Sequence, residues 1–308
     1  MRIGWNGTGT VQSASLARVQ DDLQTAADAG YASYWLADHP TGGFDALTAL
    51  AVAGQHVPDI ELGTAIVPTF PRHPMALAAQ ALTTSQALQG RLTLGVGLSH
   101  ATMMADLGIE FEKPIRHLRE YLSILVPLLE SGEVDFEGEL LSCSARVFKP
   151  GQSACSVLVA ALGPQALEVA GRLAAGTTLA WVGPKTIAEH IVPRISEAAA
   201  AAGRSAPRIM ATLPVCVTHD ADSVRATIAK NLGSYGALPS YRAMFDREGV
   251  AGPADVALVG SADEVEDRIN SLRDAGVTDF CPTVFALSAE DKAATGALLA
   301  SVISASGN

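Results

Sequence analysis

Two histidines stand directly after short apolar runs, in the segments YWLADHP and GVGLSH. A histidine can donate a hydrogen bond to a ring nitrogen or oxygen, or act as an acid or base near neutral pH. We therefore predict that His39 and His100 are catalytic. The alternative for His39 is a loop residue that pairs with Asp38. Gly97, two residues from Ser99, would let the backbone approach a flat ring, although glycine here also suits a tight turn.

Two Gly-Pro pairs open helical patterns, in AALGPQALEVAG and LAWVGPKT. Proline fits the first turn of a helix, and the N–H groups at a helix start can bind an anion. Two such starts on neighbouring strands, at Gly163-Pro164 and Gly183-Pro184, predict a cradle for one phosphate group. The alternative is that both pairs only start helices. Arg72 and His73, in the proline-rich run VPTFPRHP, form a cationic patch or a rigid connector with a solvated arginine.

The composition excludes several classes of function. A net charge of −11 argues against a nucleic-acid or anionic-membrane binder, because phosphate binding needs clustered lysine and arginine. The four cysteines form no CxxC pair, and no GxSxG, HExxH or metal-ligand cluster is present, so we predict no metal site. No signal peptide and no apolar run of about 18–20 residues is found. We expect a cytoplasmic protein that binds no membrane and acts on a small molecule.

One module recurs along the 308 residues: a helical pattern ends in glycine and a short apolar strand follows. Gly30, Gly90, Gly176 and Gly276 mark these turns, where a left-handed residue closes a helix. With four further strand patterns (RIGWN, IELGTAIV, SVLVAAL and RIMATLPVCV) the count reaches eight. Alternating strands and helices in this number predict a (β/α)8 TIM barrel. The alternative is an open doubly wound sheet, but GWNGTGT lacks the expected GxGxxG.

The spacing is broken once, between strand patterns four and five. The segment from about 101 to 153 contains an amphipathic helix from Lys113 and an alternating hairpin pattern. We predict a top-face insertion that forms a lid on a single domain spanning 1–308. A second irregular stretch holds Tyr235, Tyr241 and Phe245, which we expect over the site or at a subunit contact.

The runs YWLADHP, LGTAIVPTFPRHP, RLTLGVGLSH and VLVAALGPQALEVAGRLAAG resemble the luciferase-like group, and more narrowly the actinobacterial coenzyme F420-dependent oxidoreductases. The resemblance runs from Arg2 to about Ile191 and returns at GSADEVEDRINSLRDAGVTDF. It implies a bacterial luciferase-like barrel that holds a deazaflavin over its strand ends. We expect a homodimer, which is common in this family.

The resemblance also implies roles for individual residues. Asp38 and His39 match the family's Asp-His pair, whose histidine lies near the reacting ring, and Ala65-Ile66 matches a cis peptide behind the ring. The cofactor phosphate would bind at the segment that the family uses for it, completed by the end of the next strand. These residues are Ala160, Ala161, Gly163, Pro164, Thr178 and Trp181. Because the cofactor carries an acidic tail, we expect Arg72, His73 and Lys113 to face the mouth.

The sequence departs from the sugar-phosphate dehydrogenases of the group. His100 stands where they carry an acidic glutamate, and no tryptophan follows Asp38-His39. The resemblance therefore favours hydride transfer between coenzyme F420 and a C=C, C=N or C=O bond of a small organic substrate. Two alternatives remain: a monooxygenase that uses flavin mononucleotide (FMN), and a non-catalytic barrel that binds flavin or deazaflavin.

Overall fold

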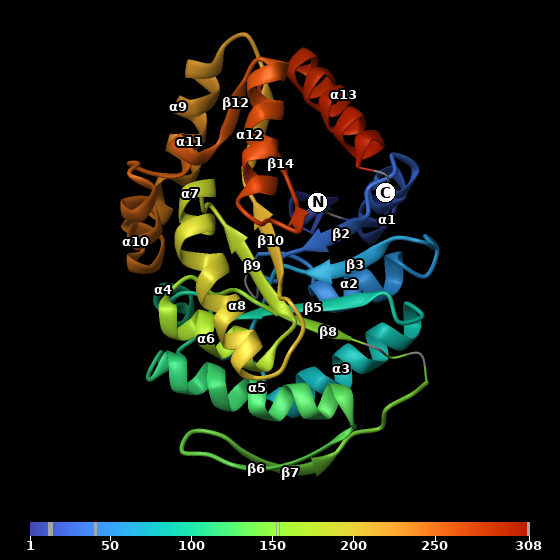
Figure 1. Ribbon diagram of the computed structural model, residues 1–308. Helices are drawn as coiled ribbons and strands as arrows, with labels where there is room; N and C mark the ends of the chain where they lie inside the picture. Colours follow the sequence, from blue (N-terminus) through green and yellow to red (C-terminus); the bar gives the residue numbers. More distant parts are fainter. Residues whose placement is uncertain (12–14, 40–41, 152, 154, 307–308) are drawn as a thin grey trace.

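Eight parallel strands close into a barrel in the computed structural model of the chain, which describes residues 1–11, 15–39, 42–151, 153 and 155–306 (Figure 1). In ring order they are β1 (Arg2–Asn6), β2 (Ser33–Leu36), β3 (Glu61–Thr64), β5 (Leu92–Gly97), β8 (Ser156–Val159), β9 (Gly176–Ala180), β10 (Arg208–Thr212) and β13 (Asp279–Phe280). The ring is closed because β13 pairs with both β10 and β1, and β3 pairs with both β2 and β5. The predicted TIM barrel is confirmed, and the open sheet is excluded.

Helices surround this barrel and alternate with its strands (Figure 1). They are α1 (Leu16–Asp28), α2 (Ala46–Ala53), α3 (Pro74–Ala87), α5 (Pro114–Glu130), α6 (Pro164–Leu173), α7 (Pro184–Thr186), the π-helical turn η2 (Ile187–Ile191), α8 (Val192–Ala201), α12 (Ala262–Asp274) and α13 (Ala289–Ala305). Gly30, Gly90 and Gly276 have φ angles of 78°, 82° and 96°, which confirms three of the four predicted left-handed turns. The prediction is wrong for Gly176, which has a φ of 155° and is the first residue of β9. Among the described helices, none combines the length and apolar character that a membrane crossing requires.

Three of the predicted strands are divided in two. After β3, the chain bends at Ala65-Ile66 and resumes as β4 (Val67–Pro68). Past the barrel ends, β10 and β13 continue as β11 (Pro214–Val217) and β14 (Thr283–Val284), which form a small parallel sheet with β12 (Leu258–Gly260). A proline stands at each of the last two breaks, and proline has no N–H to donate to a ladder.

The remaining short elements lie between these strands and helices. They are η1 (Thr8–Thr10), α4 (Ala101–Asp106), β6 (Glu133–Glu137), β7 (Ser142–Arg146), α9 (Ala221–Leu232), η3 (Gly233–Ala237), α10 (Pro239–Glu248) and α11 (Pro253–Val256). Most of them follow β5 or β10, so these two connections carry most of the chain outside the regular barrel.

The predicted lid over 101–153 is wrong for most of its length. Helix α5 is an ordinary helix of the outer ring, packed between α3 and α6. The β6–β7 hairpin packs on α5 and lies outside it, at the bottom of the view in Figure 1. The carboxylate of Glu120, on α5, accepts hydrogen bonds from the backbone of the hairpin turn at Leu140 and Leu141, both at 2.8 Å. Only α4 directly follows a strand end, so only this part of the segment stands at the mouth.

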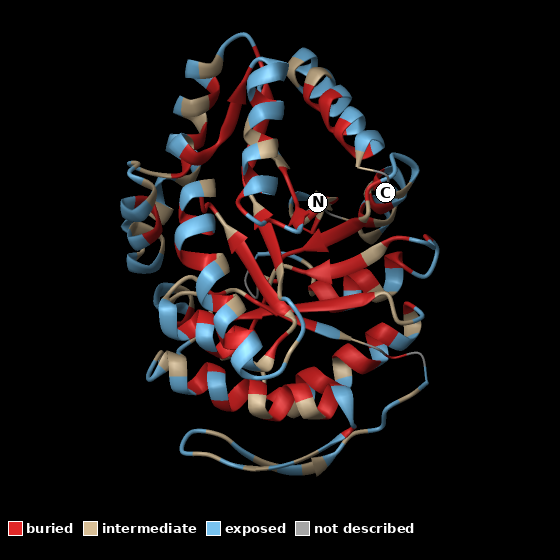
Figure 2. Cartoon of the chain, in the orientation of Figure 1, coloured by how far each residue is buried: buried red, intermediate tan, exposed pale blue. Residues whose placement is uncertain are grey.

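The barrel strands are buried and the outer faces of the helices are exposed (Figure 2). The amino-terminal end of the barrel is closed by ion pairs. Arg208 lies 2.8 Å from Glu61 and 2.7 Å from Asp279, at the starts of β10, β3 and β13. Burial alone would raise the pKa of Glu61, but the hydrogen bond and charge of Arg208 lower it instead. Because ion pairs fill the amino-terminal end of the barrel, we look for the active site at the carboxyl-terminal ends of the strands, where barrels of this kind carry it.

Candidate cofactor and active site

The floor of the candidate site is formed where β3, β5 and β8 end. The Ala65-Ile66 peptide bond is cis, as the resemblance implies. A Cβ placed on Gly97 would lie 2.9 Å from the Cβ of Ala160 and 3.2 Å from the Ile66 side chain. Three predicted cofactor-binding positions from three strand ends are therefore in direct contact. A larger side chain at Gly97 would fill the space beside Ile66. The glycine therefore leaves this space free for a flat ring.

Asp38 is bound to this floor through its backbone and to Arg72 through its side chain. Its N–H donates to the Ile66 carbonyl at 3.1 Å. Its carboxylate is almost fully buried, and Oδ2 lies 2.8 Å from Nη2 of Arg72. Burial raises the pKa of Asp38, while the charge of Arg72 opposes that rise. Within the described residues, Asp38 Oδ2 has this ion pair but accepts no hydrogen bond.

Arg72 is engaged by two carboxylates, so its predicted role as a cofactor-binding cation at the mouth stays a prediction. Its Nη2 also lies 2.6 Å from the carboxylate of Asp45, and its Nη1 donates to Gln80 at 3.2 Å. The same Asp45 carboxylate caps α2 by accepting from Thr48 N at 2.8 Å. The guanidinium therefore ties the ends of β2 and β3 and the start of α2 together, and its charge is already matched by two carboxylates.

The other two predicted cations are also engaged elsewhere. The ring nitrogen Nδ1 of His73 accepts from Met75 N at 3.2 Å and caps α3. The ammonium of Lys113 pairs with Glu139 in the hairpin turn, next to Arg116. Neither side chain is directed to the strand ends, so the structure gives no support for them as ligands of an acidic tail.

His39 lies close enough to His100 to influence the charge of His100. Burial lowers the pKa of His100, and the neighbouring charge of His39 lowers it further. His100 precedes α4 and packs against two tyrosine rings, with centroid distances of 6.3 Å to Tyr235 and 5.8 Å to Tyr241. The two predicted catalytic residues therefore share one side of the barrel mouth.

Trp181 and Tyr235 extend this aromatic wall. Their ring centroids are 5.7 Å apart, and Tyr235 in turn lies 5.2 Å from Tyr241. Trp181 has a positive φ of 58°, and its indole nitrogen is buried without a geometric hydrogen-bond partner in the described part of the chain. The prediction that Tyr235 and Tyr241 pack over the site agrees with these contacts. Phe245 does not join them, because it is fully buried in the core.

Thr178 faces the inside of the barrel. It pairs in register with Met210, whose side chain packs with Trp35 and Leu158 in the barrel interior. Because side chains alternate along a strand, the preceding Thr177 points outward. Its hydroxyl donates to the carbonyl of Val159 at 2.8 Å, so Thr177 secures the end of β8.

The two Gly-Pro helix starts have different surroundings. Gly163 caps α6 with no side-chain hydrogen bond, and a Cβ built on it would meet open space. The start of α7 is already filled, because the carboxylate of Glu248 accepts from Thr186 N at 2.7 Å and from Lys185 N at 3.2 Å. The predicted double cradle is therefore wrong at Gly183-Pro184. One helix start, at Gly163-Pro164, remains open to an anion.

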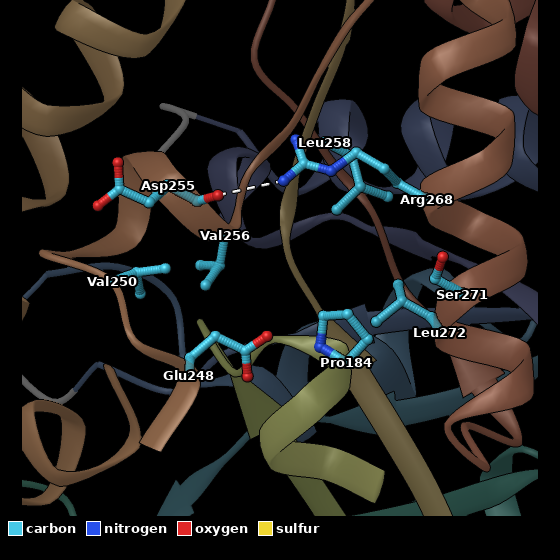
Figure 3. A pocket seen from close by; sticks show the side chains of 9 residues that line it. All are labelled: Pro184, Glu248, Val250, Asp255, Val256, Leu258, Arg268, Ser271 and Leu272. Atoms are coloured by element: carbon cyan, nitrogen blue, oxygen red, sulfur yellow. Dashed lines mark hydrogen bonds between the residues drawn. The ribbon is translucent and has the colours of Figure 1, made fainter. Parts of the chain in front are cut away.

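A cavity of about 190 Å³ lies beside Glu248, between α7, α11, β12 and α12 (Figure 3). Apart from Pro184, its lining includes none of the predicted site residues. Arg268 on its wall donates to the carbonyl oxygens of Asp255 at 3.2 Å and Ala257 at 2.7 Å. Its guanidinium thus fixes α11, and the cavity is separate from the strand-end site.

Two histidines that the sequence did not single out support the site from behind. His117 on α5 bonds Thr69 at 3.1 Å and stacks on Phe70 at 3.9 Å, and burial lowers its pKa to about 4. His190 is buried and donates to the carbonyl of Leu162 at 2.9 Å. His117 therefore holds the side chain of Thr69 after β4, and His190 holds backbone after β8. No local sequence signal marks either one, because their partners are 48 and 28 residues away.

Comparisons with known proteins identify the family. The model of the luciferase-like monooxygenase family matches residues 1–279. The chain belongs to this family. Among its relatives, the 5,10-methylenetetrahydromethanopterin reductase of Methanolobus tindarius is 24% identical over 304 residues, covering 89% of this chain and 92% of that protein.

Two further proteins are similar to this chain as well. The F420-dependent glucose-6-phosphate dehydrogenase of Microbacterium testaceum is 30% identical over 210 residues, covering 64% of this chain and 62% of that protein. The solved structure of the coenzyme F420-dependent tetrahydromethanopterin reductase from Methanopyrus kandleri has a TM-score of 0.80, at 23% identity, and covers 97% of each chain. This likeness shows the same fold.

Proposed function

We propose that this protein is a coenzyme F420-dependent oxidoreductase that transfers a hydride between the deazaflavin and a C=C, C=N or C=O bond of a small organic substrate. The observation that carries this proposal is the continuous arrangement at the strand ends. A floor of Ile66, Gly97 and Ala160 leads to the open helix start at Gly163, and two histidines stand beside it. Relatives named as F420-dependent support the choice of cofactor.

The residues present fit a planar, phosphate-bearing cofactor. The glycine at Gly97 leaves room that a Cβ would occupy, and the N–H groups at the start of α6 suit a phosphate. The buried Asp38 Oδ2 has Arg72 as its ion-pair partner but accepts no hydrogen bond among the described residues. A carboxylate oxygen can accept more than one contact, so a ligand N–H in reach of Asp38 would be favoured.

The protein's part in the reaction would be to orient the ring, exclude water and supply a proton. When bound, the deazaflavin supplies or accepts the hydride. His39 would donate a hydrogen bond near the ring or give the proton. His100, whose pKa is lowered, is neutral at pH 7 and can act as a second donor through its N–H. The rings of Tyr235 and Tyr241 would shield this side from solvent.

Titration with both cofactors tests the proposal. Quenching of protein fluorescence should give micromolar binding of coenzyme F420 and weaker binding of FMN. Anaerobic turnover with the deazaflavin should persist, since hydride transfer does not need oxygen. Binding of FMN alone, with turnover only in oxygen, would establish the monooxygenase instead. Binding of a cofactor with no turnover of any C=C, C=N or C=O compound would favour a non-catalytic barrel.

We also propose that the protein is a homodimer of one-domain subunits spanning 1–308 and that it works in the cytoplasm. The resemblance to the luciferase-like group implies a homodimer, and the cysteine content fits a reducing compartment. Light scattering during size-exclusion chromatography should give about twice the mass of the 31.8 kDa chain. A mass equal to one chain would contradict the dimer.

A further inference from the structure

His190 lies in an unusual turn of helix beside the candidate phosphate site. Helix α7 passes into α8 through the π-helical turn η2, so that one long helix contains a local bulge. Such bulges are rare and occur often at functional sites. The bulge contains His190, which is only 3% exposed, and directs its Nε2 to the Leu162 carbonyl at 2.9 Å.

This hydrogen bond fixes the peptide that leads into α6. A carbonyl oxygen can only accept, so Nε2 of His190 carries the proton and donates. The peptide between Leu162 and Gly163 is planar, and its C=O and N–H point in opposite directions. Because the C=O is directed at His190, the N–H of Gly163 is directed away from it. That N–H takes no part in the backbone hydrogen bonds of the described turns and loops.

The neighbouring peptides are held by other groups. Ala160 N donates to the Val96 carbonyl at 2.8 Å, and the Thr177 hydroxyl reaches the Ala161 carbonyl at 3.4 Å. Leu162 depends on His190 as its side-chain partner. No side chain caps Gly163, and open space surrounds its Cα. His190 is thus the last side chain to fix the backbone before the open helix start.

The charges around His190 keep its ring neutral. Burial lowers its pKa, the hydrogen bond to Leu162 opposes this, and Arg247 and Arg194 lower the pKa further. Arg194 lies one turn along the same helix, and Arg247 lies on α10, whose packing covers α7. A neutral ring still donates through Nε2, so the positioning bond does not need a protonated histidine.

We propose that His190 is a positioning residue that aims the Gly163 N–H and the start of α6 at the phosphate group of the cofactor. This inference rests on the proposed function for its ligand, but it applies to any phosphate-bearing flavin or deazaflavin on this barrel. Without the hydrogen bond from His190, the Leu162-Gly163 peptide can rotate, and the Gly163 N–H no longer points at the phosphate. The stacking floor at Gly97 and Ile66 would not change.

The test compares ligands with and without phosphate. Dissociation constants are measured for coenzyme F420 and its phosphate-free deazaflavin riboside, and for FMN and riboflavin. We expect His190→Phe to weaken the phosphate-bearing ligands about tenfold, as for loss of one hydrogen bond that orients a charged ligand. The phosphate-free ligands should keep their affinity within about twofold. His190→Gln, which places an N–H at similar reach, should restore most of the phosphate-dependent binding. The matched control is His219→Phe, at an exposed position.

Several outcomes would overturn the inference. Equal weakening of all four ligands by His190→Phe would show a general structural role. The same conclusion would follow if His190→Gln bound none of the four ligands more tightly than His190→Phe does. Unchanged binding of the phosphate-bearing ligands would exclude any role. If wild-type protein binds FMN but not coenzyme F420, the proposed cofactor is wrong, whereas the FMN to riboflavin ratio still decides the role of His190. If His190→Phe does not fold, the affinity ratio of phosphate-bearing to phosphate-free ligand is measured with His190→Gln. A ratio that differs from the wild type for both the deazaflavin pair and the FMN and riboflavin pair contradicts the proposal.

Discussion

Replacement of Arg72 by methionine should destabilise the protein more at pH 8 than at pH 5. The guanidinium lies 2.8 Å from Asp38 and 2.6 Å from Asp45. The Asp38 side chain is 3% exposed and that of Arg72 is 25% exposed. Removing one partner of a buried pair leaves an unmatched charge and costs about 3–5 kcal/mol. Because Arg72 is partly exposed, we expect a loss of about 2–3 kcal/mol at pH 8.

The pH dependence follows from the pKa of Asp38. Burial already raises it, and loss of Arg72 raises it further. A carboxyl whose folded pKa lies above its unfolded pKa favours the folded state at low pH, and this advantage is lost as the pH rises through the folded value. At pH 5 the variant can protonate Asp38 and relieve the unmatched charge. The deficit should therefore shrink to about 1 kcal/mol, the remainder being the lost bonds to Asp45 and Gln80. The variant keeps the hydrogen bonds from Thr48 that lower the pKa of Asp45.

Urea unfolding at the two pH values measures the effect. The double variant Asp38→Asn with Arg72→Met removes both charges and should recover about half of the loss at pH 8. The matched control is Arg18→Met, an exposed arginine on α1, which should change stability by less than about 0.5 kcal/mol. A deficit that is equal at both pH values, or a double variant no better than Arg72→Met, would refute the reasoning.

Three further predictions concern other contacts. Glu248→Ala should lower stability by about 1–2 kcal/mol and speed hydrogen exchange at Thr186 N, because the start of α7 loses its acceptor; unchanged exchange would contradict the capping. Gly97→Val should weaken deazaflavin binding at least about tenfold, with an unchanged circular dichroism spectrum, since its side chain enters the floor; full binding would place the ring elsewhere. Glu61→Gln should cost about 2 kcal/mol at pH 7 in thermal unfolding. Because Arg208 lowers the pKa of Glu61, that difference should fade as the pH drops below about 4, and a constant difference would contradict it.

The barrel could be predicted because its signals are local. Each of Gly30, Gly90 and Gly276 needs only its own φ to end a helix, and each apolar strand is short and continuous. The number and order of such units limit the fold to a few arrangements. The breaks at Leu213 and Pro282 were missed because the strand patterns run through them unchanged. A continuous apolar run does not show where a strand leaves one sheet and joins another.

For the segment from 101 to 153, the sequence predicts the secondary structure correctly but its position on the barrel wrongly. The helix and the hairpin were both predicted, and both exist as α5 and β6–β7. Their position was wrong because helical periodicity gives one apolar face but not the partner of that face. In α5 the buried residues pack against α3 and α6, as in any helix of the ring. An insertion and a regular barrel helix with a hairpin attached have the same sequence pattern.

The two Gly-Pro pairs show what the sequence cannot predict. Both pairs predict a helix start that could bind an anion, but only one of the two starts is open. Gly163-Pro164 and Gly183-Pro184 both start helices, and nothing in the adjacent residues distinguishes them. What separates them is a carboxylate 65 residues beyond Gly183: Glu248 occupies one start, while the other faces open space. An anion would have to displace Glu248 from the start of α7, and with it two hydrogen bonds that join α10 to α7. The open start at Gly163 needs no such displacement. Only the tertiary structure therefore decides which of two equal signals is available to a phosphate.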